Sequence, residues 1–261
     1  MKNLLKTAIL AATEAGQEIL KIYENPIAVE IKDDNSPLTL ADKHANTVIN
    51  HHLEPLGIPI ISEENKQTAY EVRKGWNRCW IVDPLDGTKE FIKRNGEFTV
   101  NIALIENDTP VLGVIYVPVT KELYFSSPQQ KGAFKTILQS GANVEEFLEH
   151  AKPIHPQTAE VVKIVGSKSH LNEDTSNFIK SVEKSTPVEV ISKGSSLKFC
   201  LVAEGKAQLY PRFAPTMEWD TAAGDAICRA VGVSVIDQTT AKPMKYNKQN
   251  LLNNYFLVRY A

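Results

Sequence analysis

The chain has 261 residues, of which 43% are hydrophobic, and its formal net charge is −2. A chain of this length can bury a sizeable core in one large domain or two smaller ones. The near-balanced charge argues against binding to a nucleic-acid polymer, which needs a basic surface, but it is compatible with a small anionic substrate.

The first segment, Met1 to Tyr23, carries charged residues and lacks the apolar region of a signal peptide. Its apolar residues recur at steps of three and four, which predicts an amphipathic helix from Leu5 to Ile22. A polar loop over Lys32–Pro37 precedes a second helix, predicted at Leu40–Leu53. Thr39 is its expected N-cap, and Asp42 lies in its first turn.

Strand patterns dominate the rest of the first half, and the last three of them form an antiparallel meander. The predicted strands are Ile58–Ile61, Cys79–Val82, Phe98–Leu104, Pro110–Val117 and Glu122–Phe125.

In the second half, strands alternate with helices, which predicts an α/β layer. The predicted strands are Val161–Val165, Val188–Ile191, Gln208–Tyr210, Val233–Ile236 and Tyr255–Val258, and the predicted helices are Glu173–Val182, Leu197–Ala203 and Thr221–Val231. Pro153 and Pro156 interrupt the pattern between the halves. We therefore expect an N-terminal α+β half over residues 1–152 and a C-terminal α/β half over residues 153–261.

Cys79, Cys200 and Cys228 are the three cysteines, and they form no CxxC pair. This favours reduced thiols in a cytoplasmic protein over a disulfide framework or a zinc site. No run of residues is long and apolar enough to cross a membrane. The sequence leaves open a peripheral attachment to the inner face of the cell membrane.

The segment Asp83-Pro84-Leu85-Asp86-Gly87-Thr88 carries the strongest chemical signal. A buried strand delivers Asp83 at its end, and Pro84 sharpens the turn that brings Asp86 close to it. Two such carboxylates repel each other unless a dication lies between them. The amides of Gly87 and Thr88 could face an anion if a helix starts there. The alternative is an ordinary Asp-rich turn.

Further carboxylates stand at Glu63-Glu64, Asp42 and Asp220. Each has a simpler explanation when taken alone: a solvated loop for the Glu pair, and a helix cap for Asp42 and Asp220. The small residues Ala222–Gly224 would let the helix after Asp220 pack closely, which a capping role does not explain. Together the carboxylates offer hard oxygen ligands, and the six histidines show no ligand spacing, so Mg²⁺ is the favoured metal.

Two groups of motifs resemble a known family. Glu63-Glu64, Asp83–Thr88 and Trp219–Gly224 resemble the inositol monophosphatase superfamily of lithium-sensitive Mg²⁺ phosphatases. Lys89–Leu104 and Gly194–Gly205 resemble its bacterial 3'(2'),5'-bisphosphate nucleotidase branch. The similarity runs from Asn35 to the C-terminus and is weakest over residues 131–160.

The resemblance implies an α+β fold, a layered αβαβα sandwich of the inositol monophosphatase and fructose bisphosphatase type. The first half would supply most metal ligands, and the second half would close the site and contact the nucleotide. The implied reaction is hydrolysis of adenosine 3',5'-bisphosphate to AMP and phosphate, with the sulfated analogue as a further substrate and a role in sulfur assimilation. It would use roughly two or three Mg²⁺ ions and a metal-activated water.

The resemblance also implies a role for individual residues. Asp42, Thr88 and Glu63 would be catalytic, with Asp42 accepting a hydrogen bond from Thr88 so that the threonine oxygen can accept the proton of the attacking water. The implied metal ligands are Glu63, Asp83, the carbonyl of Leu85, Asp86 and Asp220. The implied substrate contacts are Glu63, Leu85, Asp86, Gly87, Thr88, Gly194, Ser195, Lys198 and Asp220.

Gly194 and Ser195 could offer amides at a helix start, with Lys198 as a cation one turn later; the alternative is a plain capped helix. Arg212 could reach the ligand; the alternative is an exposed loop residue, which is the default interpretation. An inositol or sugar monophosphate phosphatase is the closest alternative function, and a non-catalytic metal- or nucleotide-binding regulator is a more distant one. The expected partner is a small nucleotide.

Overall fold

The computed structural model describes residues 1–24, 29–31, 37–139, 143–166 and 172–260, with the backbone alone at 29–31 and 37–39. The predicted loop at 32–36, the start of the resemblance at Asn35 and the capping role of the Thr39 side chain lie outside this description. The helices are α1 (Lys2–Tyr23), α2 (Leu40–Leu53), η1 (Glu54–Leu56), α3 (Tyr70–Arg73), α4 (Thr88–Ile92), α5 (Val144–His150), α6 (Glu173–Glu183), α7 (Leu197–Ala203), η2 (Glu218–Asp220) and α8 (Ala222–Ala230).

A seven-stranded sheet forms the centre of the first half, in the order β3-β4-β5-β6-β7-β8-β9. Its strands are β3 (Ile60–Ser62), β4 (Arg78–Asp86), β5 (Thr99–Glu106), β6 (Thr109–Val117), β7 (Glu122–Ser127), β8 (Gly132–Ile137) and β9 (Lys152–Pro153). Strands β4 to β9 pair antiparallel, so the predicted meander is confirmed and extends further than expected.

A six-stranded sheet follows in the second half, in the order β11-β10-β12-β15-β13-β14. Its strands are β10 (Val162–Gly166), β11 (Val188–Ser192), β12 (Leu209–Arg212), β13 (Val233–Asp237), β14 (Lys242–Pro243) and β15 (Phe256–Tyr260). The short strands β1 (Val29–Ile31) and β2 (Pro37–Thr39) form a separate antiparallel pair.

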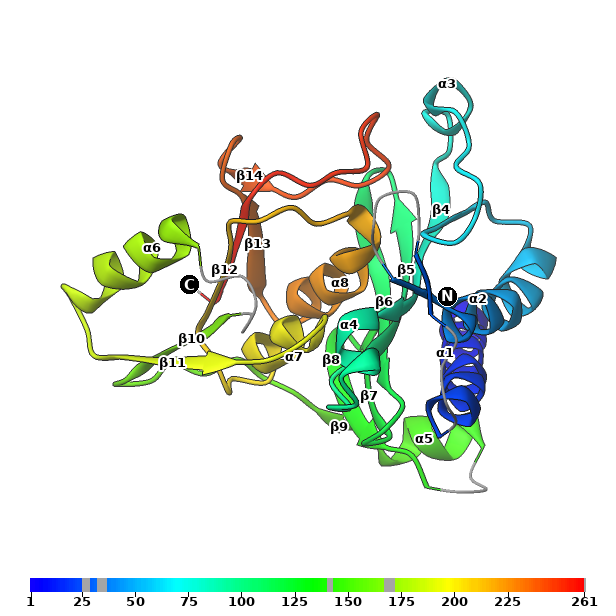
Figure 1. Ribbon diagram of the computed structural model, residues 1–261, viewed down its shortest axis with the longest axis horizontal. Coiled ribbons are helices and arrows are strands. Elements are labelled where there is room, and N and C mark those ends of the chain that lie inside the picture. The colour runs from blue at the N-terminus through cyan, green and yellow to red at the C-terminus, as the bar shows by residue number, and fades with distance from the viewer. Residues whose placement is uncertain (25–28, 32–36, 140–142, 167–171, 261) are drawn as a thin grey trace.

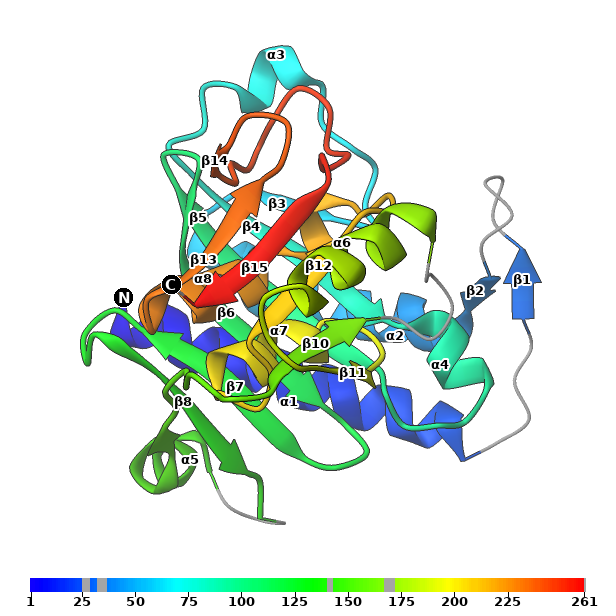
Figure 2. The same ribbon diagram turned by 90° about the vertical axis from the view of Figure 1, so that its left-hand side faces the viewer.

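The sheets and helices are stacked in layers (Figure 1). Helices α1 and α2 cover one face of the seven-stranded sheet, and α7 and α8 lie between that sheet and the six-stranded one, with α6 outside. Figure 2 shows the same stack from the side of α6. This is the expected αβαβα sandwich, and the fold prediction is confirmed.

Both faces of the seven-stranded sheet are buried, one against each group of helices. Successive side chains of a strand therefore enter different cores, because they point to opposite faces. On β4, Trp80 and Val82 join the core formed with α1 and α2, while Cys79 and Ile81 join the core formed with α7 and α8. Asp83 continues the second series, so the alternation turns its carboxylate toward the second half of the chain.

Helix α8 packs unusually close to its neighbours, as its small residues predicted. A Cβ atom added at Gly224 would collide with the ring of Phe199 on α7. Across the interface, a Cβ atom at Gly113 on β6 would collide with the backbone of Ala223 and lie 2.8 Å from the Cβ of Ala226. Glycine is needed at both positions to bring α7, α8 and β6 together.

One detail near the expected metal site differs from the prediction. Asp83 to Asp86 is not a turn after the strand but its last part, with a register shift against β5: Asp83 pairs with Asn101, and Asp86 pairs with Thr99. A bulge of this kind lets β4 accommodate Pro84, which has no N–H to donate to the ladder.

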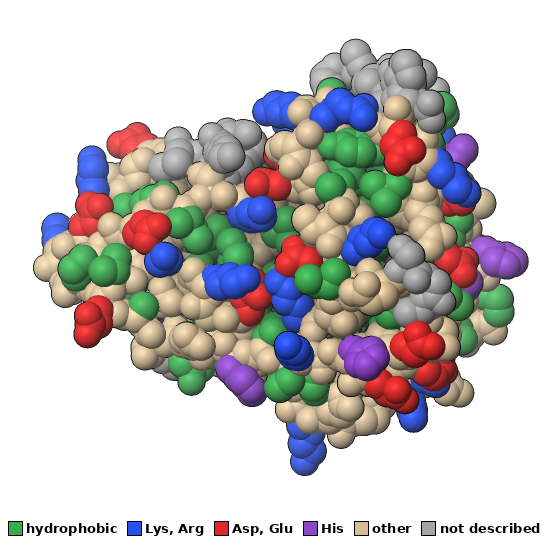
Figure 3. All heavy atoms as spheres, turned by 90° about the horizontal axis from the view of Figure 1, so that it is seen from below, with side chains coloured by type: hydrophobic (Ala, Val, Ile, Leu, Met, Phe, Trp, Pro, Cys, Tyr) green, Lys and Arg blue, Asp and Glu red, His purple; other side chains and the backbone are tan. Residues whose placement is uncertain are grey.

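Acidic and basic side chains are interspersed over the face seen in Figure 3. The three cysteines are buried free thiols. Across the described ranges, no helix is long and apolar enough to span a bilayer.

Candidate active site

Two neighbouring strands bring acidic residues to one edge of the seven-stranded sheet. Strands β3 and β4 are parallel, with Ser62 opposite Val82, so Glu63 and Asp83 follow at the same end. The amide of Glu63 donates a hydrogen bond to the carbonyl of Val82 at 3.3 Å, which holds the two strand ends together.

Asp83, Asp86 and Asp220 form a compact cluster, with one carboxylate oxygen of each lying within 4.8 Å of the others. Asp83 is 1% exposed, and its Oδ1 accepts a hydrogen bond from the amide of Leu85 at 3.1 Å. Asp220 comes from η2 in the second half, where its Oδ2 accepts from the amide of Met217 at 2.7 Å. The structure therefore brings these three predicted residues together.

Burial and mutual repulsion act on these carboxyl groups. Desolvation, followed by the charges of Glu63, Asp86, Asp220 and Asp42, raises the pKa of Asp83 well above its usual range. Desolvation and the charge of Asp86 raise the pKa of Asp220 to about 7. Glu63 is half-buried and borders a cavity that Asp83, Asp86 and Asp220 also border. Asp42 is a buried residue of α2.

Asp86 is held by residues from the second half of the chain. Its Oδ2 accepts hydrogen bonds from the hydroxyls of Ser195 and Ser196, both at 2.8 Å, and from Nδ2 of Asn101 at 3.3 Å. Ser196 Oγ also lies 2.9 Å from the carbonyl of Asp220, so its one proton is shared between these two acceptors. These supporting roles of Ser196 and Asn101 were not predicted. A polar Asn101 in the otherwise apolar run of β5 was the available signal.

Gly87 and Thr88 lie at the start of α4, next to the cluster. Gly87 has φ 94°, a left-handed conformation that glycine adopts most readily, and it lets β4 pass directly into the helix. The hydroxyl of Thr88 donates to the carbonyl of Leu85 at 3.4 Å.

Two adjoining cavities open beside the carboxylates. The larger, of about 520 Å³, is bordered by Glu63, Asp83, residues 85–90 and Asp220. The smaller, of about 140 Å³, is bordered by Asp86, Ser195 and Lys198. Residues common to both include Asp86, Gly87 and Asp220, so the cluster lies where the two cavities meet.

The expected substrate contacts at α7 are only partly brought to the site. Ser195 and Lys198 border the smaller cavity, but the amide of Gly194 donates to the carboxylate of Glu97 at 2.8 Å. Lys198 is 6% exposed, and its ammonium donates to the carbonyl of Ser195. Desolvation lowers the pKa of Lys198 to about 8, although the charge of Asp86 acts in the opposite direction.

For Arg212, the default interpretation as an exposed loop residue is wrong. Strand β12 extends to Arg212, and the half-buried side chain borders both cavities. Its Nη2 donates to the carbonyl of Pro215 at 3.2 Å, while its buried Nε has no partner among the residues that the structure describes. The strand continues two residues past its predicted end at Tyr210, because Pro211 and Arg212 still pair with β15.

Comparisons with known proteins identify the family. The model of the inositol monophosphatase family matches residues 1–255. A Salmonella typhimurium protein named 3'(2'),5'-bisphosphate nucleotidase CysQ is 45% identical, over 98% of this chain and 99% of its own. The Escherichia coli K12 protein of the same name is 44% identical over 95% of this chain and 96% of its own.

Solved structures show the same similarity. The crystal structure of CysQ from Bacteroides thetaiotaomicron, described as a bacterial member of the inositol monophosphatase family, is 50% identical. It superposes with a TM-score of 0.89 over 99% of this chain and 97% of its own. An inositol monophosphatase from Thermotoga maritima superposes with a TM-score of 0.72 at 21% identity, which shows a shared fold. The superposition covers 100% of this chain and 92% of that chain.

Proposed function

The chain belongs to the inositol monophosphatase family, and we infer that within it the chain is a 3'(2'),5'-bisphosphate nucleotidase, a phosphoric monoester hydrolase. It hydrolyses adenosine 3',5'-bisphosphate to AMP and phosphate. The observation that carries this inference is the full-length similarity, at 45% identity, to nucleotidases of that name. The carboxylate cluster beside two adjoining cavities supports it.

We propose that the site binds Mg²⁺, in roughly two or three ions. The residues fit this metal because the three clustered side chains are all carboxylates, the hard oxygen donors that Mg²⁺ prefers. The proposed ligands are Glu63, Asp83, the carbonyl of Leu85, Asp86 and Asp220. When bound, the ions would activate a water and neutralise the charge of the transferring phosphoryl group.

The chain's own residues would handle the proton and the phosphate. We propose that the Thr88 hydroxyl turns from the carbonyl of Leu85 to the Asp42 carboxylate, and that Thr88 Oγ1 takes a proton from the attacking water as it passes its own proton to Asp42. Glu63 would assist in activating the same water. The amides of Gly87 and Thr88 would face the phosphate oxygens, because both residues border the larger cavity. Positioning and charge neutralisation then suffice, without a covalent enzyme intermediate.

The second phosphate needs its own cations, and we assign Arg212 and Lys198 to it. The hydroxyl of Ser195 borders the same cavity, but it already donates to Asp86. Both cations border the smaller cavity, next to the catalytic carboxylates but outside their cluster. The unpartnered Nε of Arg212 is a donor that an anion would satisfy. For Gly194, the amide would first have to leave Glu97.

A substrate comparison tests the function. We expect kcat/KM for adenosine 3',5'-bisphosphate to exceed that for inositol 1-phosphate, with activity dependent on added Mg²⁺. A higher value for inositol 1-phosphate would favour the monophosphatase alternative. Absence of turnover on both, with intact folding, would favour a binding protein.

The role of Arg212 is tested with two substrates that differ only in the 5'-phosphate. Arg212→Met should raise KM about tenfold or more for adenosine 3',5'-bisphosphate, as expected for loss of a charge-assisted contact, and much less for adenosine 3'-monophosphate. Arg259→Met is the control, because Arg259 is exposed on β15. Equal effects on both substrates would contradict the assignment.

A further inference from the structure

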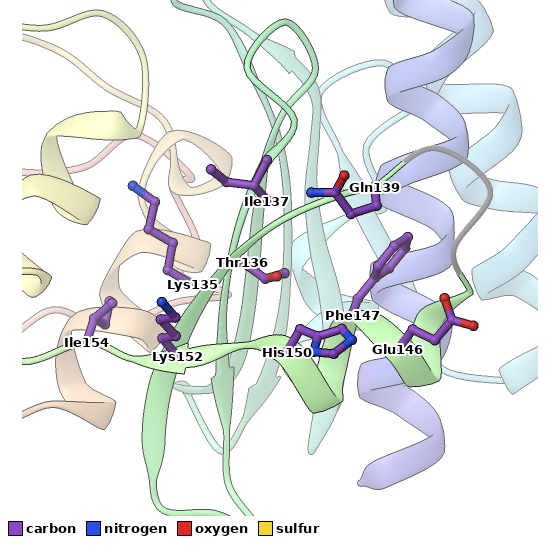
Figure 4. Close-up of a pocket in the computed structure, with 9 residues that line it drawn as sticks. All are labelled: Lys135, Thr136, Ile137, Gln139, Glu146, Phe147, His150, Lys152 and Ile154. Carbon is purple, nitrogen blue, oxygen red and sulfur yellow. The ribbon is translucent and has the colours of Figure 1, made fainter.

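A separate cavity of about 430 Å³ lies between β8 and α5 (Figure 4). None of the residues that border it also borders the two cavities beside the carboxylate cluster. It lies on the edge of the seven-stranded sheet where β8 and β9 end the strand order. The catalytic site described above makes no use of it.

The topology explains why this space exists. Strand β9 has two residues, which pair with Phe134 and Lys135 of β8. Continued at the same register, the pairing would place Ile137 opposite His150, but His150 is the last residue of α5. Neighbouring strands lie about 4.8 Å apart, whereas a helix with its side chains is about 10 Å across. A helix beside the end of β8 therefore stands further away than a strand would, and a hollow remains.

The base of the cavity is apolar. Ile137 is 56% exposed although it belongs to a strand, Phe147 of α5 is half-buried, and Ile154 is buried. In Figure 4 these three side chains surround the space between β8, α5 and the strand β9. Ordering water against such a surface is unfavourable, so an apolar ligand group would gain free energy by covering it.

Among the described residues that border the cavity, one lysine has no ion-pair partner. Lys152 is exposed, and no carboxylate of the described chain lies within 4 Å of its ammonium. Lys135 is already paired with Glu122 at 2.6 Å and with Glu204 at 3.3 Å, so it contributes mainly its alkyl stem.

The acidic residue on the wall is Glu146, whose carboxylate keeps its negative charge. Its Oε1 accepts a hydrogen bond from Nδ2 of Asn143 at 3.2 Å, and Figure 4 shows its carboxylate on the side away from Lys152. The Thr136 hydroxyl and the Gln139 amide also border the cavity and could donate hydrogen bonds.

We propose that this cavity binds a small organic anion, with its carboxylate or sulfonate beside Lys152 and its apolar body against Ile137, Phe147 and Ile154. The volume lies within the range of roughly 300–1,000 Å³ that is usual for small-molecule sites. An apolar base with one unpaired cation at the rim selects for an amphiphilic anion over a neutral hydrocarbon or a bare inorganic ion.

The test uses a fluorescent probe with this chemistry, 8-anilinonaphthalene-1-sulfonate, titrated into the full chain. We expect saturable binding to one site, displaced by hexanoate and not by adenosine 3',5'-bisphosphate. Lys152→Met should raise the dissociation constant about fivefold, the upper range for an exposed charge pair. Ile137→Glu, which places a like charge in the cavity, should raise it tenfold or more.

The chain offers a matched control for each variant. Lys242 of β14 is, like Lys152, an exposed lysine before a proline in a two-residue strand, so Lys242→Met should leave binding unchanged. Val190 is 45% exposed on β11, an edge strand, so Val190→Glu controls for Ile137→Glu. All four variants should keep nucleotidase activity, which shows that they fold.

Three outcomes would overturn the proposal. One is the absence of saturable probe binding to the native chain. Another is equal binding by Lys152→Met, Ile137→Glu and the two controls, which would indicate non-specific adsorption. The third is displacement of the probe by adenosine 3',5'-bisphosphate, which would locate the probe in the active site.

Discussion

Removing the hydroxyl of Ser196 tests how the two halves of the chain build the metal site. Ser196 Oγ lies 2.8 Å from Oδ2 of Asp86 and 2.9 Å from the carbonyl of Asp220, and it accepts a hydrogen bond from Asn101 Nδ2 at 2.9 Å. One hydroxyl therefore joins β4, β5 and η2. Ser196→Ala removes this link and leaves the metal ligands themselves unchanged.

The expected loss of Mg²⁺ affinity in Ser196→Ala depends on the contacts that still hold Asp86. Loss of an outer contact to a metal-binding carboxylate typically weakens metal binding about 10- to 100-fold. Ser195 still holds Asp86 at 2.8 Å, so we expect the lower end, about a tenfold rise in the half-saturating Mg²⁺ concentration. The Asn101 amide loses its better acceptor, so the free energy of unfolding should also fall by about 1–2 kcal/mol.

The assay is Mg²⁺ titration of adenosine 3',5'-bisphosphate hydrolysis, with denaturant unfolding measured in parallel. Ser126→Ala is the control, since Ser126 is equally buried and its Oγ accepts from the amide of Gly113 at 2.8 Å, away from the cluster. It should lose stability without a change in Mg²⁺ dependence. The same half-saturating Mg²⁺ in Ser196→Ala as in the native chain would refute the reasoning, as would an equal shift in the control.

The remaining predictions concern the cluster, the second phosphate and the packing of α8. Asp83→Asn should nearly abolish Mg²⁺-dependent hydrolysis and leave the fold intact by circular dichroism; turnover at the native rate would remove Asp83 from the metal site. Lys198→Ala should raise KM chiefly for bisphosphates, and an equal effect on a monophosphate would count against it. Because the pKa of Lys198 is about 8, its ammonium is lost as the pH rises through that value, so KM for the bisphosphate should climb above pH 8 in the native chain and stay flat in the variant. Gly113→Ala should cost about 1–3 kcal/mol of unfolding free energy by overpacking against α8. Gly166→Ala should be nearly neutral, since no atom of the described residues lies within 4 Å of the added Cβ. Equal losses in the two variants would contradict the packing argument.

Local patterns in the sequence determined much of this protein. The bounds of α2 and α7 agree with those read from spacing and capping signals, because a helix of two turns or more repeats its pattern within its own length. The apolar run before Asp83 predicted a buried strand for the same reason. The shortest elements were missed, including β9, since two residues carry no periodicity.

The site also has features that local sequence determined and features that depend on tertiary contacts. The sequence by itself determined which carboxylates stand at element ends, and the resemblance of its motifs indicated the family. Only the tertiary structure decided that the hydroxyls of Ser195 and Ser196, more than a hundred positions along the chain, hold Asp86. It also turned Arg212 toward the cavities and left a hollow beside Ile137. These features depend on how strands are registered and how closely helices approach, and such contacts between distant residues leave no periodic trace in the sequence.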